Sequence, residues 1–202
     1  MAIYHPWVGG PKKGNARPPS GIAAGVYARI DQTQGAWTAP AGQDAAVMGV
    51  TSIVHPVSQA DAETLRSAGI NPIRKIAGGG IVLWGAGTFA AANESEWKYV
   101  NIRRFLLFLE RSIEEGLSWA AFEPNGETLW AAIRLEISAF LNTAWRAGAL
   151  QGTTAKDAYF VRCDATTMTQ DDIDNGRLIA VIGVAPVKPA EFVIIRIGLR
   201  CP

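Results

Sequence analysis

Two segments of the chain have residue types and a spacing that could support chemistry. Gly78-Gly79-Gly80 could wrap around a phosphate, because glycine lets backbone N–H groups approach an anion closely. The segment precedes Ile81 and an apolar run instead of opening a helix, however, and no Gly-Lys-Ser or Gly-Lys-Thr follows. This placement favours a turn over a phosphate site.

The acidic run 171–176 has the composition of a calcium-binding loop. If Gly176 is the sixth position of such a loop, the third and twelfth positions are Ile173 and Ile182, so two required oxygen ligands are missing. The pattern instead predicts a solvated helix or turn with Thr169 as its N-cap. We therefore expect no metal site and no cofactor.

The two histidines and two cysteines form no reactive pattern. His5 and His55 each precede a proline in loop-like sequence, without an acid–base partner at motif spacing. Cys163 and Cys201 have no CxxC context, which excludes a zinc motif and a disulfide scaffold and predicts two free thiols in a cytosolic protein. No catalytic residue is indicated, and we expect the protein not to be an enzyme.

The composition narrows the classes of partner. Of 202 residues, 49% are hydrophobic and 18% are charged, which is enough apolar material for a real core. A net charge of +1 disfavours nucleic acid as a partner and gives close subunit packing little repulsion to overcome. The N-terminus has no signal-peptide pattern, and the longest apolar runs are far shorter than the roughly 20 residues that cross a bilayer. We expect a soluble protein, cytoplasmic when it is made, with no direct membrane contact.

Two amphipathic helices dominate the second half of the chain. Apolar residues recur at spacings of three and four over 100–115 and again over 127–147, with charged residues on the opposite side of the first. Gly116 and Gly148 are the expected C-terminal caps. Ser58 should open a shorter helix that ends at Gly69.

The other segments are predicted to be strands and turns. Residues 1–50 contain so many Gly and Pro turn signals that no long helix is expected, only short strands at 2–8 and 25–30. Further strands are expected at 81–84, 119–122, 159–163, 178–184 and 192–199. The fold class is therefore α/β (α+β), a mixed sheet covered by two main amphipathic helices, with extended terminal arms. We expect an extended segment over 1–50, a core domain over 51–190 and an arm strand over 191–202.

Seven tryptophans are many for this length. Core packing explains most of them, since Trp buries a large apolar area. Anchoring of subunit contacts, where Trp is enriched, is the alternative. The residues are Trp7, Trp37, Trp84, Trp97, Trp119, Trp130 and Trp145.

An ordered series of short motifs resembles contractile tail sheath proteins. Residues 97–105 (WKYVNIRRF) are similar to the family's W-x-Y-V-N-V-R-R. Four further matches are 122–130 to F-E-P-N-x-x-x-L-W, 140–152 to F-L-x-x-L-W-R-x-G-A-L-x-G, 160–164 to F-F-V-x-C-D, and 188–197 to K-P-A-E-F-V-V-x-x-I. Segments 18–29, 37–41 and 84–86 also fit, although Gly87 stands where the family often has Arg. Family members are usually longer, so the chain is expected to be a fragment or a short relative.

The resemblance implies a structural subunit of a contractile sheath in a phage tail, an R-type pyocin or an extracellular contractile injection system. Such subunits polymerise helically around an inner tube, exchange strands with neighbours and contract to drive the tube. The implied partners are copies of the chain itself and the inner tube protein, with baseplate and terminator proteins as further candidates. The alternatives are a small-molecule-binding or catalytic α/β domain that uses the 78–80 loop, and an accessory module of a baseplate.

Two sets of site residues follow. The C-terminal run alternates with period two, so it could complete its own domain's edge or, as the resemblance suggests, extend a neighbour's sheet. The residues of this arm are Phe192, Val193, Ile194, Ile195, Arg196, Ile197 and Leu199. A tube contact should be polar and charge-based so that the sheath can release the tube on contraction, and Arg134, Arg146 and Lys156 are its candidates, unless they are ordinary solvated side chains.

Overall fold

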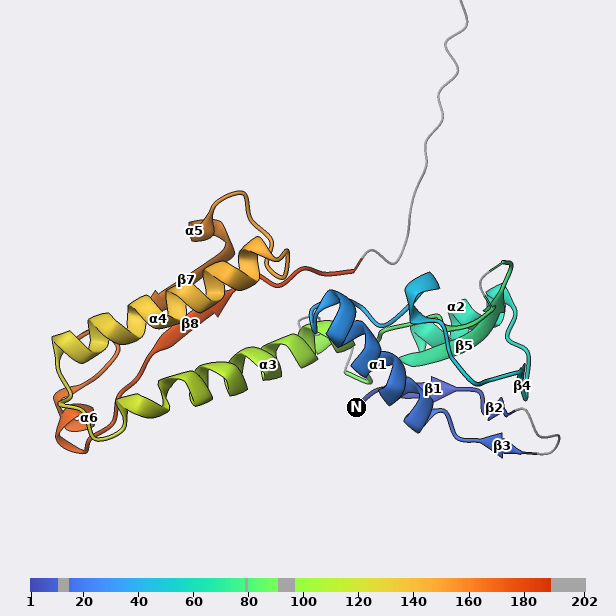
Figure 1. Ribbon diagram of the computed structural model, residues 1–202, viewed down its shortest axis with the longest axis horizontal. Coiled ribbons are helices and arrows are strands. Elements are labelled where there is room, and N and C mark those ends of the chain that lie inside the picture. Colours follow the sequence, from blue (N-terminus) through green and yellow to red (C-terminus); the bar gives the residue numbers. More distant parts are fainter. Residues whose placement is uncertain (11–14, 79, 91–96, 190–202) are drawn as a thin grey trace, which may run out of the picture.

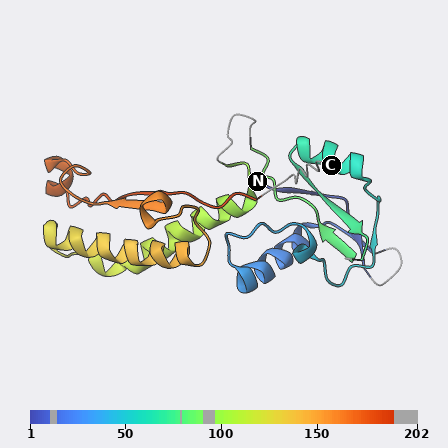
Figure 2. The same ribbon diagram turned by 90° about the horizontal axis from the view of Figure 1, so that it is seen from above.

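The computed structural model describes residues 1–10, 15–78, 80–90 and 97–189. The molecule is elongated and has two lobes, each with its own hydrophobic core (Figures 1 and 2). The core of the N-terminal lobe (residues 1–89) collects buried side chains between positions 8 and 83, and the core of the C-terminal lobe (residues 97–189) collects those between positions 105 and 168. Helix α3 (Val100–Gly116) starts beside the first lobe and runs the length of the second (Figure 1).

A mixed three-stranded sheet forms the centre of the N-terminal lobe. Strand β5 (Ile70–Ile76) pairs in parallel with β1 (Ile3–His5) and antiparallel with β6 (Gly80–Leu83), which agrees with the strand expected at 81–84. Pro72 lies inside β5, at the point where pairing to β1 ends and pairing to β6 begins. This position lets the strand contain a residue without an N–H donor.

The prediction of an extended segment over the first 50 residues is wrong. Helix α1 (Ser20–Gln34) occupies 15 of them, including the predicted strand at 25–30. Its buried residues Ala23, Val26 and Ile30 pack into the same core as Ile73 and Leu83. The boundary expected at residue 50 therefore does not separate packing units, since this core includes residues on both sides of it.

Smaller elements complete the lobe. Strands β2 (Val8–Gly9), β3 (Ala16–Arg17) and β4 (Ser52–Ile53) form a second antiparallel sheet with β2 in the middle. A 3-10 turn, η1 (Gln43–Ala45), follows α1. Helix α2 (Gln59–Ser67) begins as predicted, with Ser58 in a capping box with Asp61.

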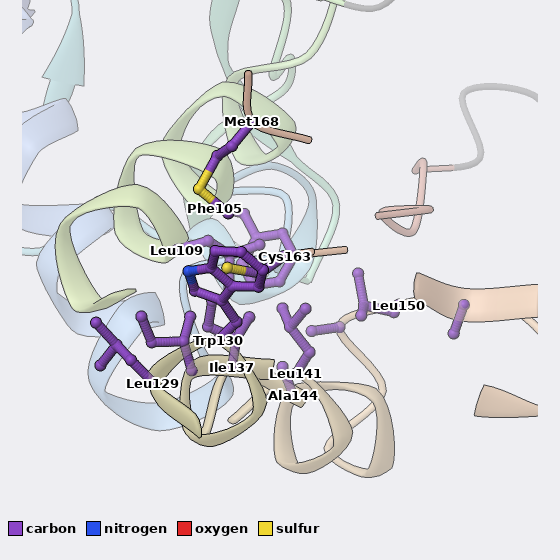
Figure 3. Packing of buried hydrophobic residues seen from close by; sticks show 13 residues of the cluster. Phe105, Leu109, Leu129, Trp130, Ile137, Leu141, Ala144, Leu150, Cys163 and Met168 are labelled. Carbon is purple, nitrogen blue, oxygen red and sulfur yellow. The ribbon is translucent and has the colours of Figure 1, made fainter. Parts of the chain in front are cut away.

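The C-terminal lobe confirms both long helices. Helix α4 (Glu127–Arg146) lies along α3, and a two-stranded antiparallel sheet, β7 (Tyr159–Arg162) and β8 (Val181–Val184), packs against them (Figure 1). Phe105, Trp130 and Leu141 meet in the core between these elements, and the thiol of Cys163 lies among them (Figure 3). Two short helices complete the lobe: α5 (Ala155–Ala158) precedes β7, and α6 (Gln170–Asp174) lies between β7 and β8. Helix α6 has the predicted Thr169 cap.

The strand expected at 119–122 is wrong. Residues 117–120 form a 3-10 turn, η3 (Leu117–Ala120), and the side chains of Trp119 and Phe122 are exposed. Gly116 is the last residue of α3 with ordinary helical angles, so the predicted cap there is also wrong. Gly148 has the expected positive φ of 83°, directly after α4.

The α+β class is confirmed, but the strands form three small sheets instead of one sheet beneath both helices. Among the described residues, no helix is long and apolar enough to span a membrane, and no three His, Cys, Asp or Glu side chains gather as metal ligands. The expected arm strand at 192–199 and Cys201 lie outside the described residues.

Candidate assembly surfaces and the joint between the lobes

An ion pair joins the two lobes. Arg104, in the second turn of α3, makes a bidentate contact with Asp31 near the end of α1, and its Nη1 lies 2.9 Å from Asp31 Oδ1. The guanidinium of Arg104 also stacks 4.6 Å from the ring centre of Tyr27. A fork of this shape fixes direction as well as distance.

Tyr27 extends this contact into the N-terminal lobe. Its hydroxyl lies 2.6 Å from that of Tyr4 in β1, and the two rings meet edge to face. Burial raises the pKa of both tyrosines above the ordinary value, so both are neutral at physiological pH. The chain of contacts Tyr4–Tyr27–Arg104–Asp31 therefore spans β1, α1 and α3.

A second contact lies at the start of α3. The buried amide of Asn101 donates its Nδ2 hydrogens to the carbonyl of Trp37, at 2.9 Å, and to that of Val187, at 3.4 Å. The ring of Trp37 meets Phe105 edge to face at 6.0 Å. Asn101 thus ties the loop after α1 and the chain after β8 to one helical turn.

Gly35 permits this arrangement. It adopts φ 93° at the end of α1, and a Cβ there would lie 2.4 Å from the indole of Trp37. Only glycine has both the backbone freedom and the space for that indole to fold back. The joint consists of these two contacts, with Tyr4, Tyr27, Asp31, Trp37, Asn101, Arg104 and Phe105 as its residues.

Another buried amide organises the N-terminal lobe. Asn71 in β5 accepts the backbone N–H of Gly87 at 2.6 Å and donates to the carbonyls of Gly87 and Ile3 at 2.8 and 3.1 Å. It thereby holds β1 and the chain after β6 against β5. Both contacts to Gly87 use its backbone alone, and a Cβ there would lie 3.5 Å from Asn71 Oδ1, so a side chain is sterically allowed.

The candidate tube contacts are not brought together. Arg134 is held inside its own lobe by Glu127 and the carbonyl of Cys163, and the hydrogen bond that its guanidinium donates to Glu127 raises the pKa of Arg134. Arg146 ends α4, about 18 Å further along the helix at 1.5 Å per residue. Arg146 and Lys156, on α5, are exposed.

The tryptophans differ in how far they are buried. Trp130 is buried in the second core, whereas Trp7 and Trp119 are exposed. The other four, which are Trp37, Trp84, Trp97 and Trp145, are half-buried. The sheet β7–β8 is a further candidate surface, because within the described part of the chain neither strand pairs with a third.

Comparison with known proteins shows which family the chain resembles. A family model described as the phage tail sheath C-terminal domain matches residues 92–200, and one described as the phage tail sheath protein central domain matches residues 2–89. The chain belongs to the phage tail sheath family. The two matched regions correspond to the two lobes, and the run resembling W-x-Y-V-N-V-R-R supplies two joint residues, Asn101 and Arg104.

Individual sheath proteins are similar along most of the chain. The tail sheath protein of Vibrio phage KVP40 is 30% identical over 177 residues, which cover 87% of this chain and 25% of that protein. A chain in the cryo-EM structure of the anti-feeding prophage (AFP) baseplate has a TM-score of 0.91 and 37% identity, covering 99% of this chain and 55% of that one. A chain of the PVC sheath complex, an extracellular contractile injection system in its contracted state, also has a TM-score of 0.91 and 37% identity, covering 98% and 55%.

Sequence reasoning missed several residues of these sites. Asp31 and Tyr27 lie in a segment that was not expected to be helical, and Asn71 lies next to a proline that obscured its strand. Asn101 and Arg104 lie within the motif at 97–105, but their partners are 64 and 73 residues away in the sequence. No local pattern indicates such partners.

Proposed function

We propose that the chain is a structural subunit of a contractile tail sheath, which polymerises helically around an inner tube and contracts to drive the tube. The supporting observation is the 37% identity to a chain of the contracted PVC sheath complex, over both lobes. The chain spans about half of that relative, so the proposal concerns the part of the sheath subunit that these lobes represent. The AFP baseplate likeness supports copies of the chain and baseplate proteins as partners.

Electron microscopy of the purified chain, alone and mixed with inner tube protein, tests the proposal. We expect rings, tubes or sheath-like particles. A uniform monomer under all conditions would contradict it. A nucleotide at a hundred times its dissociation constant would stabilise the rival small-molecule-binding domain by about 2.7 kcal/mol, so a thermal-shift screen gives that alternative its own readout.

The arm at 191–202 is proposed to add a strand to a neighbour's sheet. The acceptor we favour is β7–β8, because neither strand has a further partner in the described residues and both are only partly buried. Backbone pairing would supply affinity, and the row Val193, Ile195, Ile197 and Leu199 would bury apolar area worth on the order of 6 kcal/mol before ordering costs.

Truncation after Ala190 and Ile195→Asp should each abolish assembly and leave the two lobes folded. Arg196→Ser, on the other face of the predicted strand, is the matched control and should still assemble. Circular dichroism monitors folding, and light scattering monitors assembly. A truncated chain that unfolds would assign the strand to its own core, and one that still polymerises would exclude the arm.

The tube contact is proposed to be polar, with Arg146 and Lys156 as its strongest candidates because both are exposed. Arg134 remains a candidate, but reversing its charge also removes its pair with Glu127. Charge reversal at Arg146 and Lys156 should therefore weaken tube co-assembly in low salt without changing the melting temperature. Unchanged co-assembly of this double variant and of the triple variant would exclude the assignment.

A further inference from the structure

The loop between η3 and α4 presents an aromatic side chain to solvent from a strained backbone. Phe122 has φ 71°, and it is the one residue other than glycine in the described part of the chain with a positive φ. Its side chain is fully exposed, with a relative accessibility of 106%. A bulky residue rarely adopts this conformation, and here no internal packing offsets the strain.

The loop around Phe122 is nevertheless held in place. Asn125 accepts the indole N–H of Trp130 at 2.8 Å and donates to the carbonyl of Arg177 at 3.1 Å, so it fixes the loop to α4 and to the chain after α6. Trp119, itself 44% exposed, donates to Glu136 at 2.8 Å. Phe122 is therefore an apolar group on a pre-positioned loop, which is the usual character of an interface anchor.

The surroundings of Phe122 are acidic. The distal tip of the molecule, residues 114–126 and 170–177, contains six Asp or Glu and one Arg. Part of this charge is used internally, since Arg177 pairs with Asp171 and Asp172. Glu114 and Glu115 pair with Arg111 in α3. Glu123 and Asp174 are exposed carboxylates outside these pairs, so a partner surface should be apolar with a basic border.

The opposite end of the same molecule has this character. The N-terminal lobe contains seven Lys or Arg against four Asp or Glu. On its β3-β2-β4 sheet, Trp7 and Val54 are joined by a backbone hydrogen bond of 3.0 Å and are 54% and 42% exposed. The exposed Arg17 lies on the same sheet, in the strand that pairs with β2.

The two surfaces lie at opposite ends of the long axis, so they cannot meet within one chain (Figures 1 and 2). Complementary surfaces at separate places on one subunit generate head-to-tail contacts between copies. We propose that the tip loop of one copy docks on the β3-β2-β4 sheet of a second copy, with Phe122 against Trp7 and Val54 and Glu123 facing Arg17. This contact rests on the proposal that the chain polymerises.

Photo-crosslinking tests the partner directly. With p-benzoylphenylalanine at position 122, mixed ¹⁵N-labelled and unlabelled chains under assembly conditions should give cross-linked dimers that join the tip to residues 7–9, 16–17 or 52–54 of another copy. The same probe at Leu135, which is 74% exposed on α4 in an ordinary helical backbone, should not join those residues. Particles whose cross-links go to the tube protein or to the C-terminal lobe, or that give none, would overturn the contact. An absence of particles would instead contradict the proposed function.

Substitutions give a second, independent readout. Phe122→Gly relieves the backbone strain, so the isolated chain should melt at an equal or higher temperature while self-association weakens on the order of tenfold. Leu135→Gly is expected to lower the melting temperature and leave association unchanged. Glu123→Lys and Arg17→Glu should each weaken association, and combining them in one chain should restore it. Unchanged association of Phe122→Gly, or failure of the combined variant to recover, would overturn the docking.

Discussion

The two lobes are stabilised by contacts of different range. In the C-terminal lobe, α3 and α4 form from residues close in sequence, and β7 and β8 complete a core of side chains from one half of the chain. In the N-terminal lobe, β1 pairs with a strand more than 60 residues later, and the amide of Asn71 satisfies backbone groups of Ile3 and Gly87. Its stability therefore depends on the buried amide of Asn71 in addition to its hydrophobic core.

Asn71→Leu should cause the largest loss of stability. It removes one hydrogen bond to the Ile3 carbonyl and leaves both backbone groups of Gly87 without the Asn71 side chain as partner, and we expect a loss of about 3–5 kcal/mol of unfolding free energy. Urea denaturation followed by Trp fluorescence measures it. Asn101→Leu, at the joint, removes hydrogen bonds to two carbonyls but also removes a buried Oδ1 that has no partner among the described residues, so its loss should be smaller. Equal losses of unfolding free energy in Asn71→Leu and Asn101→Leu would contradict this difference.

The ion pair at the joint should contribute less. Asp31 and Arg104 are 31% and 25% exposed, so solvent screening reduces their attraction, although the bidentate geometry retains part of it. A double-mutant cycle of Asp31→Asn and Arg104→Met should give a coupling energy of about 1 kcal/mol that decreases with added salt. Arg111→Met with Glu115→Gln, an exposed pair within α3, is the control and should give a smaller coupling energy. A coupling no larger than in the control would mean that the joint does not depend on this pair.

Alkaline pH should weaken the same joint through its tyrosines. The folded-state pKa values of Tyr4 and Tyr27 are raised above the unfolded value of 10.0, so their contribution is complete below pH 10 and is lost as the pH rises above it. Tyrosinate absorbance at 295 nm should show that these two groups ionise only as the chain unfolds. The control variant is Tyr27→Phe. In it, the tyrosinate absorbance that appears only on unfolding should decrease by the amount of one tyrosine, or of two if Tyr4 then ionises in the folded chain. Ionisation of Tyr4 and Tyr27 at pH 10 in the folded chain would exclude the buried pair.

The smallest effect is expected at α6, in acid. Hydrogen bonds from Thr169, with a contribution from Arg177, lower the pKa of Asp172 from 3.8 to about 2. Because the folded-state pKa is depressed, the stabilisation is present above pH 3.8 and is lost as the pH falls towards 2. An NMR titration of the Asp172 carboxyl should detect this. Thr169→Val should move its pKa back towards 3.8, and an unchanged titration in that variant would exclude the cap as the cause.

The difference in contact range also explains which elements could be predicted from the sequence. The helices α3 and α4 were predicted within a few residues, because their apolar periodicity is local. Helix α1 was missed because Pro18, Pro19, Gly21 and Gly25 are typical of turns, and the helix is stabilised by burial of Ala23, Val26 and Ile30 in a core formed by distant strands. Strand β5 was missed because the change of partner at Pro72 is a property of the sheet and not of the strand.

The candidate surfaces were predictable to a lesser extent. Exposed cations could be proposed, but the sequence did not indicate that Arg134 is held by Glu127 and Cys163. The motif 97–105 resembled the family's without revealing that three of its side chains, Asn101, Arg104 and Phe105, connect the lobes. Phe122 was expected inside a buried strand, since an apolar residue at positive φ in a polar turn has no local signature.

Because α3 is long, a small rotation at the joint moves the far end of the C-terminal lobe by a larger distance. Its 17 residues span about 25 Å, with the joint in the first two turns and the acidic tip at the far end. Arg104 lies about 18 Å from the end of the helix, so a rotation of about 10° there would displace the tip by about 3 Å. Because the same helix is a rigid rod within its own lobe, a small change of angle between the lobes becomes a step large enough to exchange one set of neighbouring contacts for another.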